Sequence, residues 1–196
     1  LACHGGSGIS LGLIETIRQI DKNYKDAQLV HRIDRDTSGC LVIALKKSIL
    51  REFHKEIRNK HVDKIYTAVV KGKWPKDLQK ITLAIKKENL KSGERFVQVN
   101  KKGKISETEF KLISSGQCNS LIRAKIITGR THQIRVHSSH KGYPIVEDSK
   151  YGDPEYNKQH QSEGLNRMLL HAESINFKNL GIKQSTPVPE VFSKYV

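Results

Sequence analysis

The sequence predicts an α+β domain whose core is a mixed, mainly antiparallel β-sheet with flanking helices. Short runs of β-branched and aromatic residues, separated by polar turns, fill the middle of the chain. Apolar residues recur at helical spacing before and after the first of these runs. A chain of 196 residues suits one substantial domain better than two. We therefore expect a single sheet-centred domain.

The strands are predicted from apolar or alternating runs bounded by turn residues. The run at Cys40–Leu45 is short and continuously apolar, which favours a strand buried on both faces. Strands are also expected at Ile65–Val70 (ending at Gly72), Ile81–Ile85, Arg95–Val99, Ser106–Ser114, Leu121–Ile127 and Arg167–Phe177. The four in the middle form an antiparallel meander, since short polar turns connect them.

Three helices are predicted, each from a capping residue and an apolar stripe. Ser10 is expected to cap a helix over Leu11–Ile20, and Ser48 a helix that runs to about residue 60. Thr131 is expected to cap a third helix, which stops before Gly142. Residues 147–166 are predicted to form a long surface loop, and the segment around Pro187 and Pro189 a poorly specified tail.

Charge is the strongest compositional signal. The chain has 35 Lys and Arg against 20 Asp and Glu, a formal net charge of +15. This excess favours a polyanionic partner. No apolar run approaches the roughly 20 residues of a membrane-spanning helix, and the lysines do not line one amphipathic helix. We therefore expect nucleic acid as the partner, and no membrane.

Cysteines and histidines provide no metal or redox signature. Cys3, Cys40 and Cys118 are far apart and odd in number, so a disulfide framework or a CxxC motif is not indicated. A reducing compartment, the cytoplasm, is the expected location. The spacing of His132, His137 and His140 lacks a glutamate base between ligands, so hydrogen bonds to backbone or phosphate are favoured over zinc.

The segment from Leu29 to Ser48 is the chemical centre of the sequence. It places Asp34 among arginines, between two hydrophobic runs and directly before a turn-forming Asp-Thr-Ser-Gly. In an extended chain Asp34 shares a side with Arg32, whereas His31 and Ile33 face the other way. An aspartate in this context can also be an ordinary turn former with a locally satisfied charge. From this segment alone, both readings remain open.

Four motifs give the chain a resemblance to the RluA-type pseudouridine synthases. They are HRIDRDTSG from His31, KIYTAVVKG from Lys64, GRTHQIRVH from Gly129 and RMLLHA from Arg167. The match extends over nearly the whole chain and is nearest to the C-type members of the branch that modifies large-subunit ribosomal RNA. The resemblance implies the pseudouridine synthase fold, with an active-site cleft on the sheet, and isomerisation of uridine to pseudouridine without a metal or other cofactor.

The resemblance also implies roles for individual residues. Asp34 falls at the catalytic aspartate, Arg135 at the arginine that pairs with it, and Tyr66 at the active-site tyrosine that packs on the uracil and helps to remove the proton at C5. Arg32 falls at a position that enters the RNA in place of the flipped base. Leu170 falls in the apolar pocket. The expected RNA-contacting residues are therefore Arg32, Arg130, His132 and Leu170.

Residues 1–196 are expected to form one pseudouridine synthase catalytic domain, part of a longer protein. The small S4-type RNA-binding domain that commonly precedes this domain in the family has no counterpart in the sequence. We expect a monomer that acts on large-subunit ribosomal RNA. The alternatives are a pseudouridine synthase for tRNA, a non-catalytic RNA-binding factor in ribosome assembly, and a metal-dependent nuclease, which would require clustered acidic ligands.

Overall fold

The structure is a computed structural model that describes residues 2–4, 11–89 and 95–196. In this part of the chain an eight-stranded sheet has the order β10-β9-β4-β8-β7-β5-β6, and β2 pairs with β9 outside this path. Its strands are β2 (Ser38–Gly39), β4 (Val62–Lys71), β5 (Lys80–Asn89), β6 (Arg95–Val99), β7 (Lys104–Ser115), β8 (Asn119–Ile126), β9 (Leu170–Phe177) and β10 (Ile182–Ser185). All pairs are antiparallel except β2 with β9. The predicted α+β class is confirmed.

Strand β4 is an interior strand of the sheet, between β9 and β8, and its second half is buried on both faces. Its register pairs Tyr66 with Ala124 of β8 and Thr67 with His171 of β9. Ala68 packs into one hydrophobic cluster with Trp74 and Phe110, while Val69 belongs to a second cluster on the other face. The β-branched and aromatic residues therefore predicted this strand correctly. Burial on both faces explains why Ala68, Val69 and Val70 are all apolar.

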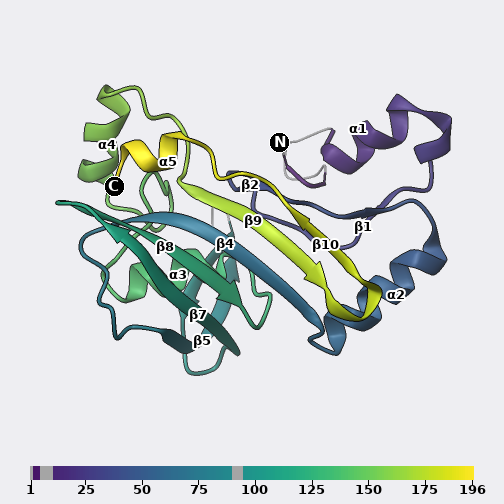
Figure 1. Cartoon of the computed structure of the whole chain (residues 1–196), viewed down its shortest axis with the longest axis horizontal. Helices are drawn as coiled ribbons and strands as arrows, with labels where there is room; N and C mark the ends of the chain where they lie inside the picture. The colour runs from purple at the N-terminus through teal and green to yellow at the C-terminus, as the bar shows by residue number, and fades with distance from the viewer. Residues whose placement is uncertain (1, 5–10, 90–94) are drawn as a thin grey trace.

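The helices lie at the two ends of the sheet and against one of its faces (Figure 1). Helices α1 (Leu13–Ile20) and α2 (Lys47–Arg58) lie near one end, and α4 (Pro154–Ser162) and α5 (Val191–Lys194) near the other. Helix α3 (Gln133–His140) packs on the sheet through Ile134, which joins the cluster of Trp74. Helix α2 packs through Phe53, whose ring centroid lies 4.5 Å from that of Phe177 on β9. Short 3-10 turns span Lys22–Tyr24 and Lys178–Leu180.

The three predicted helix caps are wrong by one or two residues. Helix α1 begins after Gly12, whose backbone N–H is bound by the Glu15 side chain, and the proposed cap Ser10 lies outside the described residues. Helix α2 begins after Lys46, which places Ser48 inside its first turn. Helix α3 begins after His132 instead of Thr131. Propensity locates a helix end only approximately, since packing selects the first turn.

The predicted buried strand at Cys40–Leu45 is largely wrong. Only Ile43–Ala44 forms a strand, β3, and it pairs with β1 (Gln28–Leu29) in a separate two-stranded sheet. Ala44 is buried, but Leu45 is exposed and the other side chains of the run are half-buried. Ala44 of this run packs in one hydrophobic cluster with Phe53 of α2, and Cys40 and Val42 pack against that cluster. The run therefore contributes to the core without belonging to the main sheet.

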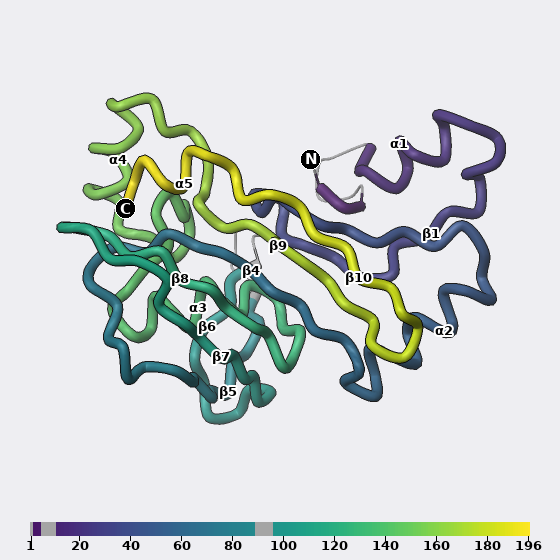
Figure 2. The backbone as a smooth tube through the Cα atoms, in the orientation of Figure 1, coloured from purple at the N-terminus to yellow at the C-terminus, as the bar shows by residue number. Residues whose placement is uncertain are grey.

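The predicted long loop and loose tail both contain ordered, packed structure. Asp153 accepts a hydrogen bond from the backbone N–H of Tyr156 and starts helix α4, with Pro154 as its first residue. In the tail, Phe192 of α5 is fully buried, and Tyr195 lies beside His160 of α4 with ring centroids 5.0 Å apart. Figure 2 shows the chain end next to α4. Among the described residues, no helix combines the length and apolar character needed to cross a bilayer.

Candidate active site

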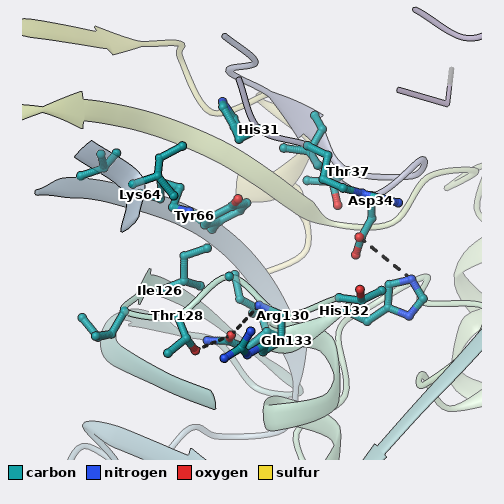
Figure 3. Close-up of a pocket in the computed structure, with 18 of the residues that line it drawn as sticks. His31, Asp34, Thr37, Lys64, Tyr66, Ile126, Thr128, Arg130, His132 and Gln133 are labelled. Atoms are coloured by element: carbon teal, nitrogen blue, oxygen red, sulfur yellow. Dashed lines mark hydrogen bonds and ion pairs between the residues drawn. The ribbon is translucent and has the colours of Figure 1, made fainter. Parts of the chain in front are cut away.

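A cleft of about 620 Å³ opens on the sheet and gathers all seven residues predicted to form the site (Figure 3). Its walls come from the loop before β2, the end of α2, the first half of β4, the loop before α3 and the first residue of β9. The predicted residues in its lining are Arg32, Asp34, Tyr66, Arg130, His132, Arg135 and Leu170. The sequence prediction of a cleft on the sheet therefore agrees with the structure.

Asp34 lies on a turn that Gly39 joins to the main sheet. Its carbonyl accepts a hydrogen bond from the backbone N–H of Thr37, 3.1 Å away, which closes the turn. Gly39 then pairs with Ala172 of β9 at φ +114°, and a Cβ at Gly39 would lie 2.2 Å from the Ala172 carbonyl oxygen. Only glycine fits this conformation and this close approach. The turn is therefore fixed against the strand that also carries Leu170.

Arg135 holds two carboxylates with different parts of its guanidinium group. Its Nε and Nη2 donate to the two oxygens of Asp148 at 2.8 and 2.7 Å. Its Nη1 points to Asp34 Oδ2 at 3.4 Å. Asp148 and Arg135 are both buried, whereas Asp34 retains partial exposure to the cleft. Asp148 thus anchors the guanidinium, and the remaining nitrogen is presented to the carboxylate at which chemistry is expected.

The pKa values show that this Asp148–Arg135 pair stays charged. Burial alone would raise the pKa of Asp148, but hydrogen bonds and charge from Arg135, together with the backbone N–H groups of Lys150 and Tyr151, bring it below its ordinary value. Burial would likewise lower the pKa of Arg135, and the two carboxylates raise it instead, with Asp148 contributing more than Asp34. The guanidinium is therefore a permanent cation beside Asp34.

Tyr66 and Leu170 form the apolar wall of the cleft next to Asp34. Both side chains are buried in the cluster that contains Trp74 and Phe110. Burial, and secondarily the charge of Asp34, raises the pKa of Tyr66 well above its usual range. Tyr66 therefore carries its phenolic proton at neutral pH while Asp34 is charged. The phenol ring offers a flat surface of the kind on which a uracil packs.

His132 is oriented by a hydrogen-bond chain that begins on β6. The backbone N–H of Val97 donates to the Tyr151 hydroxyl oxygen at 2.9 Å, and the same hydroxyl lies 2.8 Å from His132 Nδ1. Burial raises the pKa of Tyr151 to about 12, so its proton is present and donates to Nδ1. Burial also lowers the pKa of His132. We expect the neutral ring to carry its proton on Nε2, the nitrogen that faces Asp34 Oδ1 at 4.0 Å.

Gln133 fixes the loop that precedes α3. Its side-chain oxygen accepts from the Thr128 hydroxyl at 2.7 Å and from the backbone N–H of Arg130 at 3.0 Å. Its side-chain nitrogen donates to Glu107 O and to Thr108 Oγ1, each at 2.9 Å. This uses the full hydrogen-bonding capacity of the amide.

The side chains of Arg130 and Arg32 are exposed at the rim of the cleft, where they can reach a ligand.

Four residues of the site were missed by the sequence reasoning: Lys64, Gln133, Asp148 and Tyr151. Asp148 offered the best signal, because it follows the apolar Ile145–Val146 pair and is a charged residue next to a buried segment. Within the described residues, no three side chains of the metal-ligating types are grouped so that they could hold a metal ion.

The fold and the site define a carboxylate–arginine active site in a cationic cleft, and comparison with known proteins identifies the family. The family model described as RNA pseudouridylate synthase matches residues 3–140, and the chain belongs to this family. The family resemblance inferred from the four sequence motifs is thereby confirmed.

The curated relatives found by sequence include two bacterial proteins named ribosomal large subunit pseudouridine synthase C. The one from Haemophilus influenzae is 47% identical over 179 residues, which cover 91% of this chain and 56% of the relative. The one from Escherichia coli is 44% identical over 182 residues, covering 92% of this chain and 57% of the relative. The chain therefore spans a little over half the length of these relatives.

Solved structures show the same fold. Human RNA pseudouridylate synthase domain containing 1 superposes with a TM-score of 0.73 at 26% sequence identity, covering 94% of this chain and 77% of that chain. The predicted pseudouridine synthase fold is thus confirmed by three-dimensional similarity as well as by sequence.

Proposed function

We propose that this chain isomerises specific uridines to pseudouridine in large-subunit ribosomal RNA, with Asp34 as the catalytic carboxylate. The observation that carries the proposal is the contact of Arg135 Nη1 with Asp34 at 3.4 Å, in a cleft whose apolar wall is Tyr66 and Leu170. Arg135 thus places a positive charge beside a carboxylate that faces the cleft, and a carboxylate in this position can act as the reagent in cleavage of a glycosidic bond. Family membership and the named relatives support the same activity.

The charge of the cleft supports RNA as the substrate. Its lining contains a single carboxylate among the described residues, Asp34, against six basic side chains: Arg32, Arg58, Lys60, Lys64, Arg130 and Arg135. Arg135 is compensated by Asp148, which leaves a clear positive excess. Contacts of lysine and arginine with phosphates supply most of the affinity of such surfaces for nucleic acid. A uridine in RNA would enter this cleft with its backbone held by the surrounding cations.

The reaction requires the uridine to leave its stack. Flipping a base out of a helix costs a few kcal/mol, which contacts in the pocket and a side chain filling the gap offset. Tyr66 and Leu170 are placed to pack on the uracil, and the exposed Arg32 is placed at the rim to fill the gap. The bond between N1 and C1′ breaks, the uracil turns, and C5 bonds to C1′. The proton lost from C5 is balanced by one gained at N1.

The raised pKa of Tyr66 bears on the last proton transfer. While Asp34 is charged, its field adds to burial in keeping the Tyr66 phenol protonated. A protonated phenol cannot accept the C5 proton, so Tyr66 would first have to lose its own proton, which burial opposes. Packing on the uracil, which needs no ionisation, is the role of Tyr66 throughout the reaction.

The test is tritium release from C5-labelled uridine in a large-subunit ribosomal RNA transcript, with and without EDTA. We expect EDTA-resistant release from the unaltered chain and none from Asp34→Asn, which retains shape but removes the charge. Release from the Asp34→Asn protein would reject the assigned role. A non-catalytic RNA-binding factor would bind the transcript without release, a nuclease would cut it only without EDTA, and a tRNA-specific synthase would release tritium only from labelled tRNA.

A further inference from the structure

Lys64 is a half-buried cation in the active-site cleft that no described carboxylate compensates. It lies two residues before Tyr66 on β4, so both side chains project from the same face of the strand into the cleft. Figure 3 shows Lys64 on the far side of Tyr66 from Asp34. Burial lowers the pKa of Lys64, and no charged partner raises it. The folded protein therefore holds an ammonium group in a site that penalises its charge.

None of the described groups around Lys64 offsets its positive charge. The neighbouring Asp63 projects from the other face of β4, where its oxygen lies 3.1 Å from Lys125 Nζ and 3.2 Å from Lys178 Nζ. On the cleft side, burial and the charge of Lys64 lower the pKa of His31 to about 4. Arg58 and Lys60, at the end of α2, line the same cleft and add positive charge. These groups on the cleft side therefore bring no negative charge to Lys64.

The contrast with Arg135 shows what is missing at Lys64. Arg135 is more deeply buried than Lys64, but it is matched by two carboxylates, at 2.7 and 3.4 Å. An uncompensated charge in a partly buried site is destabilising, and a ligand of opposite charge removes that penalty when it binds. A neutral uracil carbonyl would accept a hydrogen bond but would leave the charge uncompensated. An anion fits the site.

We propose that Lys64 binds a backbone phosphate of the RNA next to the flipped uridine, with Arg58 and Lys60 as the outer part of the same subsite. This inference rests on the proposed function, which places the uracil at Tyr66. Residues two apart on a strand are about 7 Å apart, a spacing of the same order as that between a base and the phosphates of its nucleotide. Lys64 would therefore meet a phosphate while Tyr66 meets the base.

The test measures binding of a short ribosomal RNA fragment containing the target uridine, in Asp34→Asn protein so that turnover does not interfere. We expect Lys64→Met to weaken binding about tenfold and to reduce the slope of log affinity against log salt by about one. Lys64→Arg retains the charge and should restore much of both quantities. Lys111→Met serves as the matched control, because Lys111 is an exposed lysine on the opposite face of the sheet.

Replacement of single phosphates by uncharged methylphosphonates identifies the contact. At one position next to the target uridine, the methylphosphonate should weaken binding to the protein that retains Lys64 about tenfold but leave binding to Lys64→Met almost unchanged. If every methylphosphonate weakens binding to both proteins by the same factor, the inference is overturned. Because binding is measured without turnover, this result is separate from failure of the proposed isomerisation, which the tritium assay alone reports.

Stability without RNA gives a second, independent readout. Removal of an uncompensated, half-buried charge should raise the unfolding temperature of Lys64→Met by a few degrees, although the substitution weakens RNA binding. A residue kept only for folding would show the opposite, a lower unfolding temperature. A fall in unfolding temperature with an unchanged salt slope would therefore reject the subsite.

Discussion

The two ends of the active-site cleft differ in whether their charged side chains have partners of opposite charge. At the Asp34 end, Arg135 forms ion pairs with Asp148 and Asp34, and Tyr151 holds the neutral His132 by a hydrogen bond. At the Lys64 end, the described cations Lys64, Arg58 and Lys60 have no carboxylate partner in the cleft. The first end is preorganised before a ligand arrives, as catalysis requires. The second end is complete only when an anion occupies it, as binding requires.

Replacement of Arg135 by methionine should give the largest effect that distinguishes the two ends. Without the guanidinium, the carboxylates of Asp34 and Asp148 lose their shared counter-ion in a buried site, which corresponds to about 4 kcal/mol. We expect turnover to fall by roughly 10³-fold, while RNA affinity falls less than about tenfold. Single-turnover tritium release and equilibrium binding measure the two quantities.

The matched control is Arg130→Met, which removes an exposed arginine from the rim of the same cleft. Its effect should fall mainly on RNA affinity and on the salt dependence of binding. If Arg135→Met loses affinity and turnover by the same factor, Arg135 belongs with the binding cations and the distinction between the two ends is wrong. Circular dichroism of both variants checks that the fold is retained.

Asp148→Asn should have an intermediate effect. The substitution keeps the shape of the side chain but removes the charge that anchors Arg135, so turnover should fall by about 10²-fold. Combined with Arg135→Met, the loss should be much smaller than the product of the single losses, because both residues act through one contact. A full multiplicative loss would show that Asp148 acts independently of Arg135.

The same variant makes a prediction for stability in acid. The pKa of Asp148 is lowered in the folded protein, so its contribution to stability is present above the unfolded pKa of about 3.9 and is lost as pH falls toward the folded value. Between about pH 5 and pH 2, Asp148→Asn should therefore lose stability with pH less steeply than the unaltered protein. Urea unfolding at several pH values measures the slope, and identical slopes would contradict the assigned pair.

Tyr151→Phe should have the smallest of these effects on turnover. It removes the hydroxyl that donates to His132 Nδ1 and leaves the backbone N–H of Val97 without its acceptor. We expect turnover to fall about tenfold and the free energy of unfolding to fall by about 1–3 kcal/mol. Nitrogen NMR of His132 should show the Nε2–H tautomer in the unaltered protein and a mixture of tautomers in the variant. An unchanged tautomer would show that Tyr151 does not orient the ring.

The sequence predicted the reactive residues better than it predicted the residues that hold them in place. Asp34 and Arg135 are 101 residues apart and were expected to meet, because the motifs that contain them resemble a known family. Asp148, which holds Arg135 in place, was assigned to a surface loop. The segment around it folds against α3, and Asp148 itself is almost fully buried. A single charged residue in a polar stretch has no periodic signal that would reveal such burial.

The secondary structure was likewise predicted only in part. The strands of the meander were predicted close to their observed positions, since alternation of side chains follows directly from strand geometry. Helices α4 and α5 were missed because neither has a clear apolar stripe, and each is stabilised by contacts with distant parts of the chain, as in the pairing of His160 with Tyr195. The roles assigned to Tyr66, Leu170, Arg32, Arg130 and His132 stay predictions, although all five side chains line the cleft.

The sequence by itself determined the strand pattern, the excess of positive charge and the family, because these depend on residue types and on spacing along the chain. Only the tertiary structure decided which charges are compensated. Arg135 and Lys64 are both basic residues within recognisable motifs, yet Arg135 is buried against two carboxylates, whereas Lys64 is half-buried and meets none of the described ones. Compensation depends on distances between residues far apart in sequence, and folding alone sets those distances.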